Sequence, residues 1–468
     1  MLVDDVLLEI FNFCRRMHYH QPHGNPRPEW NWHILVHVCR RWRHIIFESP
    51  HRLNLRILCT YGTPVRKNLG IWPAFPINLQ LFSLKCMEPT DEDNVIAALE
   101  HRDRVNVVRL FVTGLQMGKI AAVMQEPFPA LTHLSMRSED EDIPVLTAEF
   151  LGGVAPRLQE ITLYRIPFPA LPTLLLSTGD LVTLNLFDIP DFGYISPERM
   201  IPCLAALPRL EVFAITHKDF DSRPDPIRPP PVTRLVLPAL ISLSFKGLFE
   251  YLEDLAGHID GPQLEQISTI YVDVSDHIEV TQLSEFIDRS IGPSTFAYIH
   301  FHFPQVVFTI SREYENSAGR DRRSVATTIS HAPEMVDWKL FDLVYLLREF
   351  SAAFCTVVHL ELEAELAETD SSDDDVRDIG WLSLLHQFPA MQTLYVSSGL
   401  AGAISLALKD LTVEMAAEMF PSLRLICLEG EPASSLEQIV AIRRLSDHPI
   451  IVVETKDEFG ERLESCVS

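Results

Sequence analysis

Histidine and cysteine residues gather near the start of the chain at spacings that suggest metal chemistry. They are Cys14, His18, His20, His23, His33, His37 and Cys39. Thiolate and imidazole groups are the ligands that zinc takes in tetrahedral sites, so this set is a candidate zinc centre. Its spacing matches no common zinc motif, however, and two of the histidines lie in a stretch rich in proline and glycine. We therefore expect no metal and no other cofactor.

Arginines surround a tryptophan in the run RRWR at residues 40–43, which raises the question of nucleic-acid binding. A nucleic-acid-binding domain is usually basic overall, because it must attract phosphate groups. This chain instead has 64 acidic against 39 basic residues and a net charge of −25. We therefore expect no nucleic-acid partner and interpret these arginines as the solvent-facing side of a helix.

Catalytic motifs are missing from the sequence of 468 residues. It contains no G-x-S-x-G nucleophile elbow, no H-E-x-x-H motif and no G-x-G-x-x-G nucleotide loop. The carboxylates are numerous, but no pair of them has a spacing that indicates acid–base catalysis. We therefore expect a binding protein and not an enzyme.

Cysteine usage and hydropathy indicate the compartment. The eight cysteines are scattered without a C-x-x-C pair, which favours free thiols in a reducing environment. The apolar start of the chain carries Asp4 and Asp5, where a signal peptide would carry positive charge. No apolar run reaches the roughly 18 residues that a membrane span needs. We expect a cytoplasmic or nuclear location, or both, and no membrane association.

Seven short phrases of similar pattern recur through the rest of the chain. Each has a turn residue followed by L-x-x-L-x-L, in which the last two apolar positions alternate as in a β-strand. The phrases are FPALTHLSM (128–136), APRLQEITL (155–163), GDLVTLNLF (179–187), LPRLEVFAI (207–215), LPALISLSF (237–245), FPAMQTLYV (388–396) and FPSLRLICL (420–428). The first five lie roughly 20 to 32 residues apart, a period that indicates a solenoid, because each unit buries its face only against its neighbours.

Weaker copies of the pattern extend this array. They are Leu79-Phe82-Leu84, Val107-Leu110-Val112, Leu264-Ile267, Phe296-Ile299-Phe301 and Val357-Leu360-Leu362. The gap between residues 301 and 357 is wide enough for about one more unit of this period. Within that gap, residues 311–324 have the polar composition of a hairpin tip.

Stretches with helical spacing lie between the strand phrases, at residues 94–102, 146–154, 196–207 and 248–259. In the third stretch, Ser196 stands at an N-cap position and Pro197 at the first helical position, which is a typical helix start. Strands that alternate with helices predict an α/β fold, in which a curved parallel sheet carries helices on its outer side.

This pattern resembles the leucine-rich repeats, in particular their irregular variety. The usual repeat continues with Asn or Cys, whose side chain satisfies backbone groups at the turn. Here the equivalent positions hold Glu139, Ile166, Ile189 and Lys218. We therefore expect the turns to be capped differently from one repeat to the next, and the curvature to be uneven.

Two segments interrupt the array. Residues 221–231 are dense in proline and predict a rigid extended loop. Residues 361–378 are strongly acidic and predict a loop in solvent. Within it, Ser371 and Ser372 each stand three residues before an aspartate, as acidophilic kinases prefer. A solvated loop that is never modified explains the same composition, so both interpretations stay open.

Two amphipathic helices are predicted near the start of the chain. Residues 32–46 place apolar side chains at spacings of three, four and seven, which puts them on one helix face. These side chains are Ile34, Leu35, Val38, Trp42, Ile45 and Ile46. The upstream helix, residues 4–14, has Val6, Leu7, Ile10, Phe11 and Cys14 on its apolar face. So short a segment offers little core of its own, and the helices need a partner surface.

This pair of helices resembles the F-box, a small module that docks on Skp-family adaptors of cullin-based ubiquitin ligases. Leu2 takes the place of the opening leucine in the family pattern, and VCRRW at residues 38–42 matches the closing signature residue for residue. LNLRILCTYGTPV at 53–65, with the irregular repeats, also looks like the fungal F-box and leucine-rich-repeat proteins. The adaptor-binding residues that the resemblance implies are Leu2, Leu7, Ile10, Phe11, Val38, Cys39 and Trp42.

The resemblance implies the substrate-recognition subunit of an SCF-type ubiquitin ligase. Its partners would be a Skp-family adaptor, through it a cullin, and a protein target that the sequence does not name. The domains expected are a helical module at 1–60, a repeat domain at 61–450 and a C-terminal tail at 451–468. Two departures bear on docking: Val3 replaces the family's proline, and residues 16–29 lengthen the link between the helices.

An alternative is a protein-binding repeat scaffold without ligase function, whose N-terminal helices cap the solenoid. Solenoids need such caps, because their end repeats expose a face that inner repeats bury. The position of Val38 and Trp42 distinguishes the two readings. An exposed apolar patch there favours docking on a partner, and burial against the first repeat favours a cap.

Overall fold

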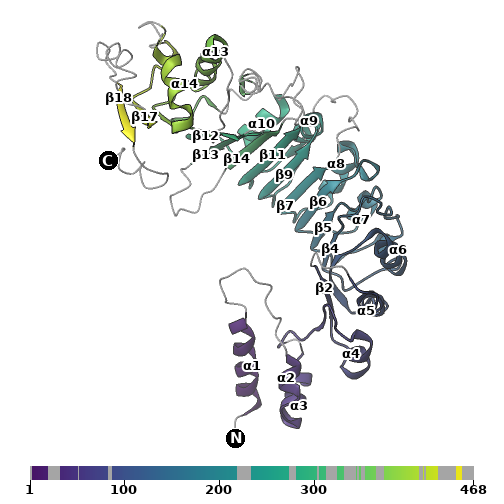
Figure 1. Ribbon diagram of the computed structural model, residues 1–468. Helices are drawn as coiled ribbons and strands as arrows, with labels where there is room; N and C mark the ends of the chain where they lie inside the picture. Colours follow the sequence, from purple (N-terminus) through teal and green to yellow (C-terminus); the bar gives the residue numbers. More distant parts are fainter. Residues whose placement is uncertain are drawn as a thin grey trace. The chain divides into compact units, whose positions relative to one another are not determined.

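Short strands alternate with helices through most of the described chain, as the repeated phrases predict (Figure 1). The computed structural model describes residues 3–18, 32–50, 52–82, 87–218, 233–272, 281–302, 305–312, 324–330, 344, 347–348, 354–364, 374–409, 415, 418–430 and 450–455. The chain divides into two units, Met1–Thr178 and Gly179–Ser468. Leu2, the proline-dense segment 221–231 and the serines at 371 and 372 lie outside the described residues.

The first unit begins with helices and continues as alternating strands and helices. Its strands are β1 (Ile57–Cys59), β2 (Ile77–Leu81), β3 (Val105–Phe111), β4 (His133–Arg137) and β5 (Glu160–Tyr164). Its helices are α1 (Asp4–His18), α2 (Trp32–Val36), α3 (Arg40–Glu48), α4 (Val65–Ile71), α5 (Pro89–Leu99), α6 (Gly114–Val123) and α7 (Leu171–Leu175), with a 3₁₀ turn, η1, at Phe150–Gly153.

The sheet of the first unit is parallel and follows chain order from β1 to β5. Apolar side chains at alternate strand positions point to the helix side, and Leu134 and Met136 of β4 are almost fully buried there. The connecting helices α4, α5 and α6 all lie on this side of the strands (Figure 1). They therefore leave the opposite side of β2–β5 uncovered.

The second unit continues the alternation with longer connections. Its strands are β6 (Thr183–Ile189), β7 (Val212–His217), β8 (Leu235–Val236), β9 (Ser242–Gly247), β10 (Ile259–Asp260), β11 (Gln266–Val272), β12 (Phe296–His302), β13 (Gln305–Ser311), β14 (Ser324–Ser330), β15 (His359–Ala364), β16 (Thr393–Val396), β17 (Leu425–Glu429) and β18 (Ile451–Thr455). Its helices are α8 (Pro197–Ala205), α9 (Phe249–His258), α10 (Thr281–Ser290), α13 (Asp374–Leu385) and α14 (Ser398–Lys409), with a 3₁₀ turn, η2, at Asp191–Gly193. No described helix is long and apolar enough to cross a membrane.

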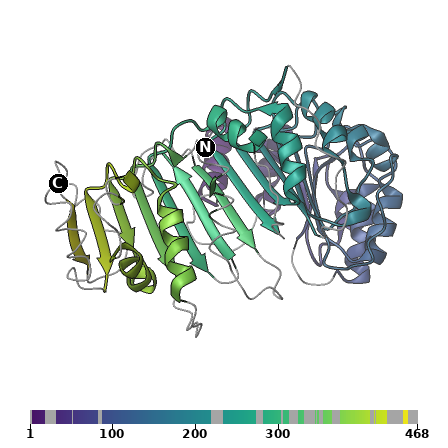
Figure 2. The ribbon, with the colours of Figure 1, turned by 90° about the horizontal axis from the view of Figure 1, so that it is seen from above.

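A hairpin interrupts the parallel order of the second unit (Figure 2). Strands β6, β7, β9 and β11 follow one another, but the next neighbours are β14, β13 and then β12. β13 runs antiparallel to both β12 and β14, and β14 runs parallel to β11. The gap between residues 301 and 357 therefore does not hold the further repeat that we expected. The predicted hairpin is confirmed by the pairing of β13 with β14.

All seven repeated phrases form strands at the predicted places, but three of the weaker copies are displaced, those at 107–112 and 296–301 by two residues and that at 79–84 by three. Val108 pairs with Leu134, and Ala297 pairs with Leu360, where the sequence pattern would align Leu110 and Ile299. A slip of two residues keeps every side chain on the same sheet face, so alternation alone does not fix the register.

The predicted connecting helices at 94–102, 196–207 and 248–259 are confirmed as α5, α8 and α9. The stretch at 146–154 forms only the short turn η1, because Leu151, Gly152 and Gly153 all have positive φ angles of 58°, 65° and 69°. A run of left-handed residues ends any α-helix.

Two segments predicted as loop or tail belong to regular structure. Residues 361–364 of the acidic segment lie in β15, and residues 374–378 begin α13; those between them lie outside the described residues. Ile451–Thr455, placed in the C-terminal tail, forms β18 and pairs in parallel with β17. The β-branched residues of this strand suit an added sheet position, and that preference outweighs the neighbouring polar residues.

Side chains from neighbouring repeats cap the helices of the first unit. Asp91 of α5 accepts a hydrogen bond from the Gly62 amide at 2.7 Å, just before α4. Asn94 accepts one from the Val65 amide at 3.1 Å, at the first residue of α4. Amides at a helix start have no partner within their own helix, so these acceptors satisfy them.

Other helices are capped in the same way by different residues. Asp140, which follows β4, accepts from the Gly114 amide at 2.7 Å, and Glu429 of β17 accepts from the Ser398 amide at 3.1 Å. A Cβ atom at Gly114 would overlap the carbonyl oxygen of Asp142, so only glycine fits at the start of α6. The expectation that capping varies from repeat to repeat is confirmed.

Glu253 of α9 is the most buried of these capping groups, with 3% of its surface exposed. Its carboxylate accepts hydrogen bonds from the amides of Gln282 at 2.5 Å and Leu283 at 2.9 Å, in the first turn of α10. The helix dipole favours a negative charge at this position. Glu253 therefore fastens one repeat to the next.

We expect Glu253→Ala to lower the free energy of unfolding by about 2 kcal/mol, because two amides of a buried helix start lose their acceptor. Glu253→Gln keeps one acceptor oxygen and should lose less. Urea denaturation of both variants measures the difference. If Glu253→Ala is as stable as the wild type, α10 is held by other contacts.

His217, the last residue of β7, lies in an aromatic cluster of the second unit. Its ring centroid is 5.2 Å from that of Tyr251, 5.6 Å from that of Tyr194 and 6.2 Å from that of Phe245. Burial lowers the pKa of His217 to about 4, although a hydrogen bond to the backbone of Lys246 acts in the opposite direction. The folded state therefore keeps this imidazole neutral.

This burial makes stability depend on pH. The unfolded chain takes up a proton on His217 below about pH 6.5, whereas the folded chain does so only near pH 4. The His217 contribution to stability is therefore complete above pH 6.5 and lost as the pH falls towards 4, by about 3 kcal/mol. Urea denaturation between pH 4 and 7 should show this slope, and His217→Gln should flatten it. An unchanged slope in that variant would assign the pH dependence to other groups.

Candidate protein-interaction site

The chain turns between α2 and α3, where the sequence predicted one helix over residues 32–46. Cys39 has an extended backbone, with φ −158° and ψ 168°, and its Sγ atom accepts a hydrogen bond from the Trp42 amide at 3.4 Å. This is an N-cap arrangement, and it begins a new helix. The prediction of one continuous helix was wrong, and Val38 and Trp42 lie on different elements.

α1 packs against α3 through an aromatic pair and an ion pair. The Phe11 ring is almost fully buried, and its centroid lies 4.8 Å from that of Trp42 in an edge-on contact. Arg41 donates from Nη2 to the Asp4 carboxylate at 2.6 Å, next to the start of α1. Leu7 is buried as well. These contacts hold two helices that are joined by a long connection.

Arg41, Arg43 and Arg52 connect elements of this region, whereas Arg40 is exposed. Arg52 pairs with Asp5 at 3.2 Å and with Glu9 at 2.7 Å, both on α1. Arg43 donates to the carbonyl oxygen of Val36 at 3.0 Å, across the turn between α2 and α3. Exposed ion pairs contribute little stability each, but these pairs offset the positive charge that the RRWR run suggested.

An aromatic cluster joins the helical module to the first strand–helix unit. Trp32 of α2 is buried and donates from its indole N–H to the Arg56 carbonyl oxygen at 2.8 Å, one residue before β1. Its ring centroid lies 5.1 Å from that of Trp72, 5.3 Å from that of Phe75 and 6.3 Å from that of Phe47. Edge-on aromatic contacts of this kind add to the energy of area burial.

The same module exposes apolar side chains on its other surfaces. Six of the 18 large apolar side chains that are exposed in the described residues belong to this short region. They are Val3, Val6, Ile10 and Phe13, in or next to α1, and Ile34 and Val38, in α2 and the following turn. The first four recur at spacings of three and four, so they lie on one side of α1. Such a concentration marks an interaction surface.

The structure divides the predicted adaptor-binding residues into exposed and buried ones. Ile10, Val38 and Cys39 are exposed, Trp42 is half-buried, Leu7 and Phe11 are buried, and Leu2 lies outside the described residues. Leu7 and Phe11 can assist docking only by holding α1 in place. Phe13 and Ile34 were missed, and the signal for Phe13 was that α1 has apolar residues on two of its sides.

The candidate zinc ligands are only partly described. The described side chains among the seven are those of His37 and Cys39; Cys39 caps α3, and the His37 ring lies 6.0 Å from that of Trp72. Within the described residues, no group of three or more His, Cys, Asp or Glu side chains is arranged to hold a metal ion. The expectation of no metal stays a prediction.

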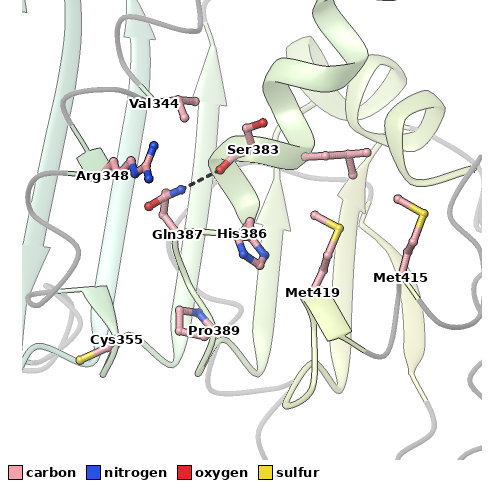
Figure 3. Close-up of a pocket in the computed structure, with 10 residues that line it drawn as sticks. Val344, Arg348, Cys355, Ser383, His386, Gln387, Pro389, Met415 and Met419 are labelled. Carbon is pink, nitrogen blue, oxygen red and sulfur yellow. Dashed lines mark hydrogen bonds between the residues drawn. The ribbon is translucent and has the colours of Figure 1, made fainter.

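A pocket of about 1110 Å³ lies in the second unit beside α13 (Figure 3). Its lining residues are Val344, Arg348, Cys355, Leu382, Ser383, His386, Gln387, Pro389, Met415 and Met419. Gln387 donates from its side-chain amide to the Ser383 carbonyl oxygen at 3.2 Å, which directs that amide along the wall. The surface of the lining is mostly apolar.

Comparisons with known proteins identify no family for the chain. No family model matches it, and no curated protein matches it. Among solved structures, it is similar to a crystal structure of a TLR13–ssRNA13 complex, with 13% sequence identity and a TM-score of 0.27 over 86% of this chain. The chain spans about half, 49%, of the length of that protein. A likeness of this degree assigns neither a function nor a ligand.

We expect Trp32→Ala to loosen the helical module from the first strand–helix unit, because it removes a buried ring and leaves the Arg56 carbonyl without its donor. The local cost should be about 3–5 kcal/mol. Trp32→Phe keeps a ring and should cost less. Hydrogen exchange measures this as lost protection of the amides in α2 and α3. Unchanged protection in Trp32→Ala would show that the module is held elsewhere.

Proposed function

We propose that the chain is a substrate receptor of an SCF-type ubiquitin ligase, with a non-catalytic role. In this proposal the N-terminal helices dock on a Skp-family adaptor, and through it on a cullin, and the sheet surface holds a protein target. The receptor catalyses no reaction itself. It keeps a bound target close to a ubiquitin-loaded enzyme, at high effective concentration. The F-box and irregular leucine-rich-repeat resemblances of the sequence give the proposal its specific form.

The observation that carries this proposal is the exposed apolar patch on a small, firmly anchored helical module. Val38, inside the VCRRW signature, is 56% exposed, and Ile10 of α1 is 41% exposed. A module that served only to close the end of the sheet would have no need of these outward apolar side chains. Buried apolar anchors supply most of the affinity in protein interfaces, so a helical partner would gain from covering them.

A repeat scaffold without ligase function is the second candidate. The aromatic cluster around Trp32 favours it, since this cluster seats the module on the first strand–helix unit as an end cap would. Both functions use different sides of the same module. Binding of a Skp-family adaptor therefore distinguishes the ligase receptor from the scaffold.

We expect Ile10→Asp with Val38→Asp to reduce capture of a Skp-family adaptor by about tenfold or more, because two charges would enter an apolar interface. Co-purification of the full chain with the adaptor measures this. Ile71→Asp is the matched control, since Ile71 is 60% exposed and lies outside the helical module. The control variant should capture adaptor as the wild type does.

Each outcome decides between the two candidates. If the folded wild-type chain captures no adaptor, the ligase assignment fails and the scaffold remains. Capture that the double variant leaves unchanged shows that the adaptor binds elsewhere. Trp42 is unsuitable for this test, because its ring packs on Phe11 and its removal would disturb the module itself.

A further inference from the structure

The uncovered side of the sheet in the first unit carries an unusual set of side chains for so acidic a chain. Strand positions that point away from the helices can be read from the pairing of β2 to β5. They hold Gln80, Val107, Arg109, Phe111, His133, Ser135, Arg137, Glu160, Thr162 and Tyr164. With Arg56, which reaches over from the start of β1, this side has three arginines, of which Arg109 forms an ion pair with Glu160 and Arg137 forms one with Glu139.

Arg109 lies at the centre of this surface, and 43% of its side chain is exposed. Its nearest carboxylate is that of Glu160, 3.6 Å away across β4, beyond hydrogen-bond range. On β4 Arg109 pairs with Ser135, which is buried, whereas Glu160 pairs with His133. Gln80 pairs with Arg109 on the other side. Arg109 is therefore a strong donor that no described residue hydrogen-bonds.

Aromatic side chains follow at the next outward position of the strands. Phe111 pairs with Arg137, and Arg137 pairs with Tyr164. The Arg137 guanidinium lies 4.3 Å from the centroid of the Tyr164 ring, a cation–π contact. Phe82, directly after β2, is 49% exposed. A ligand on this side therefore meets the exposed ring of Phe82 near the half-exposed guanidinium of Arg109.

His133 senses charges of both signs on this side. Burial lowers the pKa of His133, Glu160 raises it, and Arg109 and Arg56 lower it. The Arg56 guanidinium is placed to donate to the Asn78 amide oxygen at 3.0 Å, which fixes it on the uncovered side. An acidic group approaching this surface would find favourable charge although the whole chain carries −25.

We propose that this side of β2–β5 binds an acidic peptide segment that carries an aromatic residue. A carboxylate of the segment pairs with Arg109, and its aromatic ring lies on Phe111 and Phe82. Because this names the chemistry of the target, it rests on the proposed function as a receptor or scaffold. Arginine suits the role, since its planar fork can bind a carboxylate in two hydrogen bonds.

The charge arrangement favours a peptide over a nucleic acid. Glu160 lies within the surface, and residues 139–142 form the acidic run EDED at the end of β4. A polynucleotide would bring evenly spaced phosphates past these carboxylates, whereas a peptide can place its acidic groups only where the arginines lie. The surface has few hydrogen-bond donors, which matches the few acidic groups of a short peptide motif.

A random peptide display library selected on the immobilised full-length chain tests this directly. We expect enriched peptides to combine Asp or Glu with Phe, Tyr or Trp. Synthetic copies of the most enriched peptide should then bind Arg109→Glu about tenfold or more weakly in fluorescence anisotropy, and Arg109→Gln by an intermediate amount. Arg102→Glu is the matched control, since Arg102 is 48% exposed and precedes β3 outside this surface; it should bind as the wild type does.

Three results would overturn the proposal. They are a selection that enriches no peptide or only peptides without acidic residues, equal binding by folded Arg109→Glu and wild type, and tighter Arg109-dependent binding of a single-stranded oligonucleotide. Adaptor capture is measured on the same variants and should not change in Arg109→Glu. If peptides bind as expected while the wild type captures no adaptor, the ligase assignment fails and this site remains.

Discussion

The architecture depends on backbone groups that each repeat leaves for its neighbour to satisfy. A single strand–turn–helix unit has open hydrogen-bonding edges on its strand and unpaired amides at its helix start. Here parallel pairing closes the strand edges, and side chains such as Asp91, Asp140 and Glu253 reach into adjacent repeats to accept from the helix amides. These acceptors differ in position and chemistry, so each junction is specified separately. This explains how the sheet tolerates a period that is far from regular.

The first strand of such an array has no preceding repeat to pack on it, and the N-terminal helices pack there instead. The indole of Trp32 donates to the carbonyl that precedes β1, and the rings of Trp72 and Phe75 complete a buried cluster. Closing the end of the sheet uses one side of the module. The apolar side chains that include Ile10 and Val38 lie on other sides of the module and are exposed. End capping and partner docking are therefore compatible in one small module, and the first is the anchor that gives the second a fixed geometry.

The alternation of apolar residues was sufficient to place the sheet strands of the seven strong phrases, because inward positions are strictly selected for burial. It did not fix the register of the copies at 107–112 and 296–301, since a slip of two residues conserves the face, and it placed the copy at 79–84 three residues away from its register. The sequence pattern indicated the hairpin tip at 311–324 but not the strand order β14, β13, β12, because strand order depends on pairing between distant segments and not on local pattern. In the module, local pattern predicted two helices but not the break at Cys39, where a capping sulfur outweighs helical periodicity. Exposure of individual residues, such as Ile10 against Phe11, depended on how α1 packs on α3 through the contact of Phe11 with Trp42.

Net charge was the least informative guide to the surface. The total of −25 predicted no attraction for phosphate groups, yet the outward strand positions of β2–β5 hold two arginines and one glutamate. Charges farther apart than about 8 Å are largely screened at physiological ionic strength, so a partner in contact responds to the groups nearest to it. The acidic residues next to this surface, such as the run at 139–142, repel the phosphates of a polyanion that passes them at contact distance. A local positive site within an acidic chain is thus more selective than the same arginines would be on a basic protein, because non-specific attraction is removed while the short-range contacts are kept.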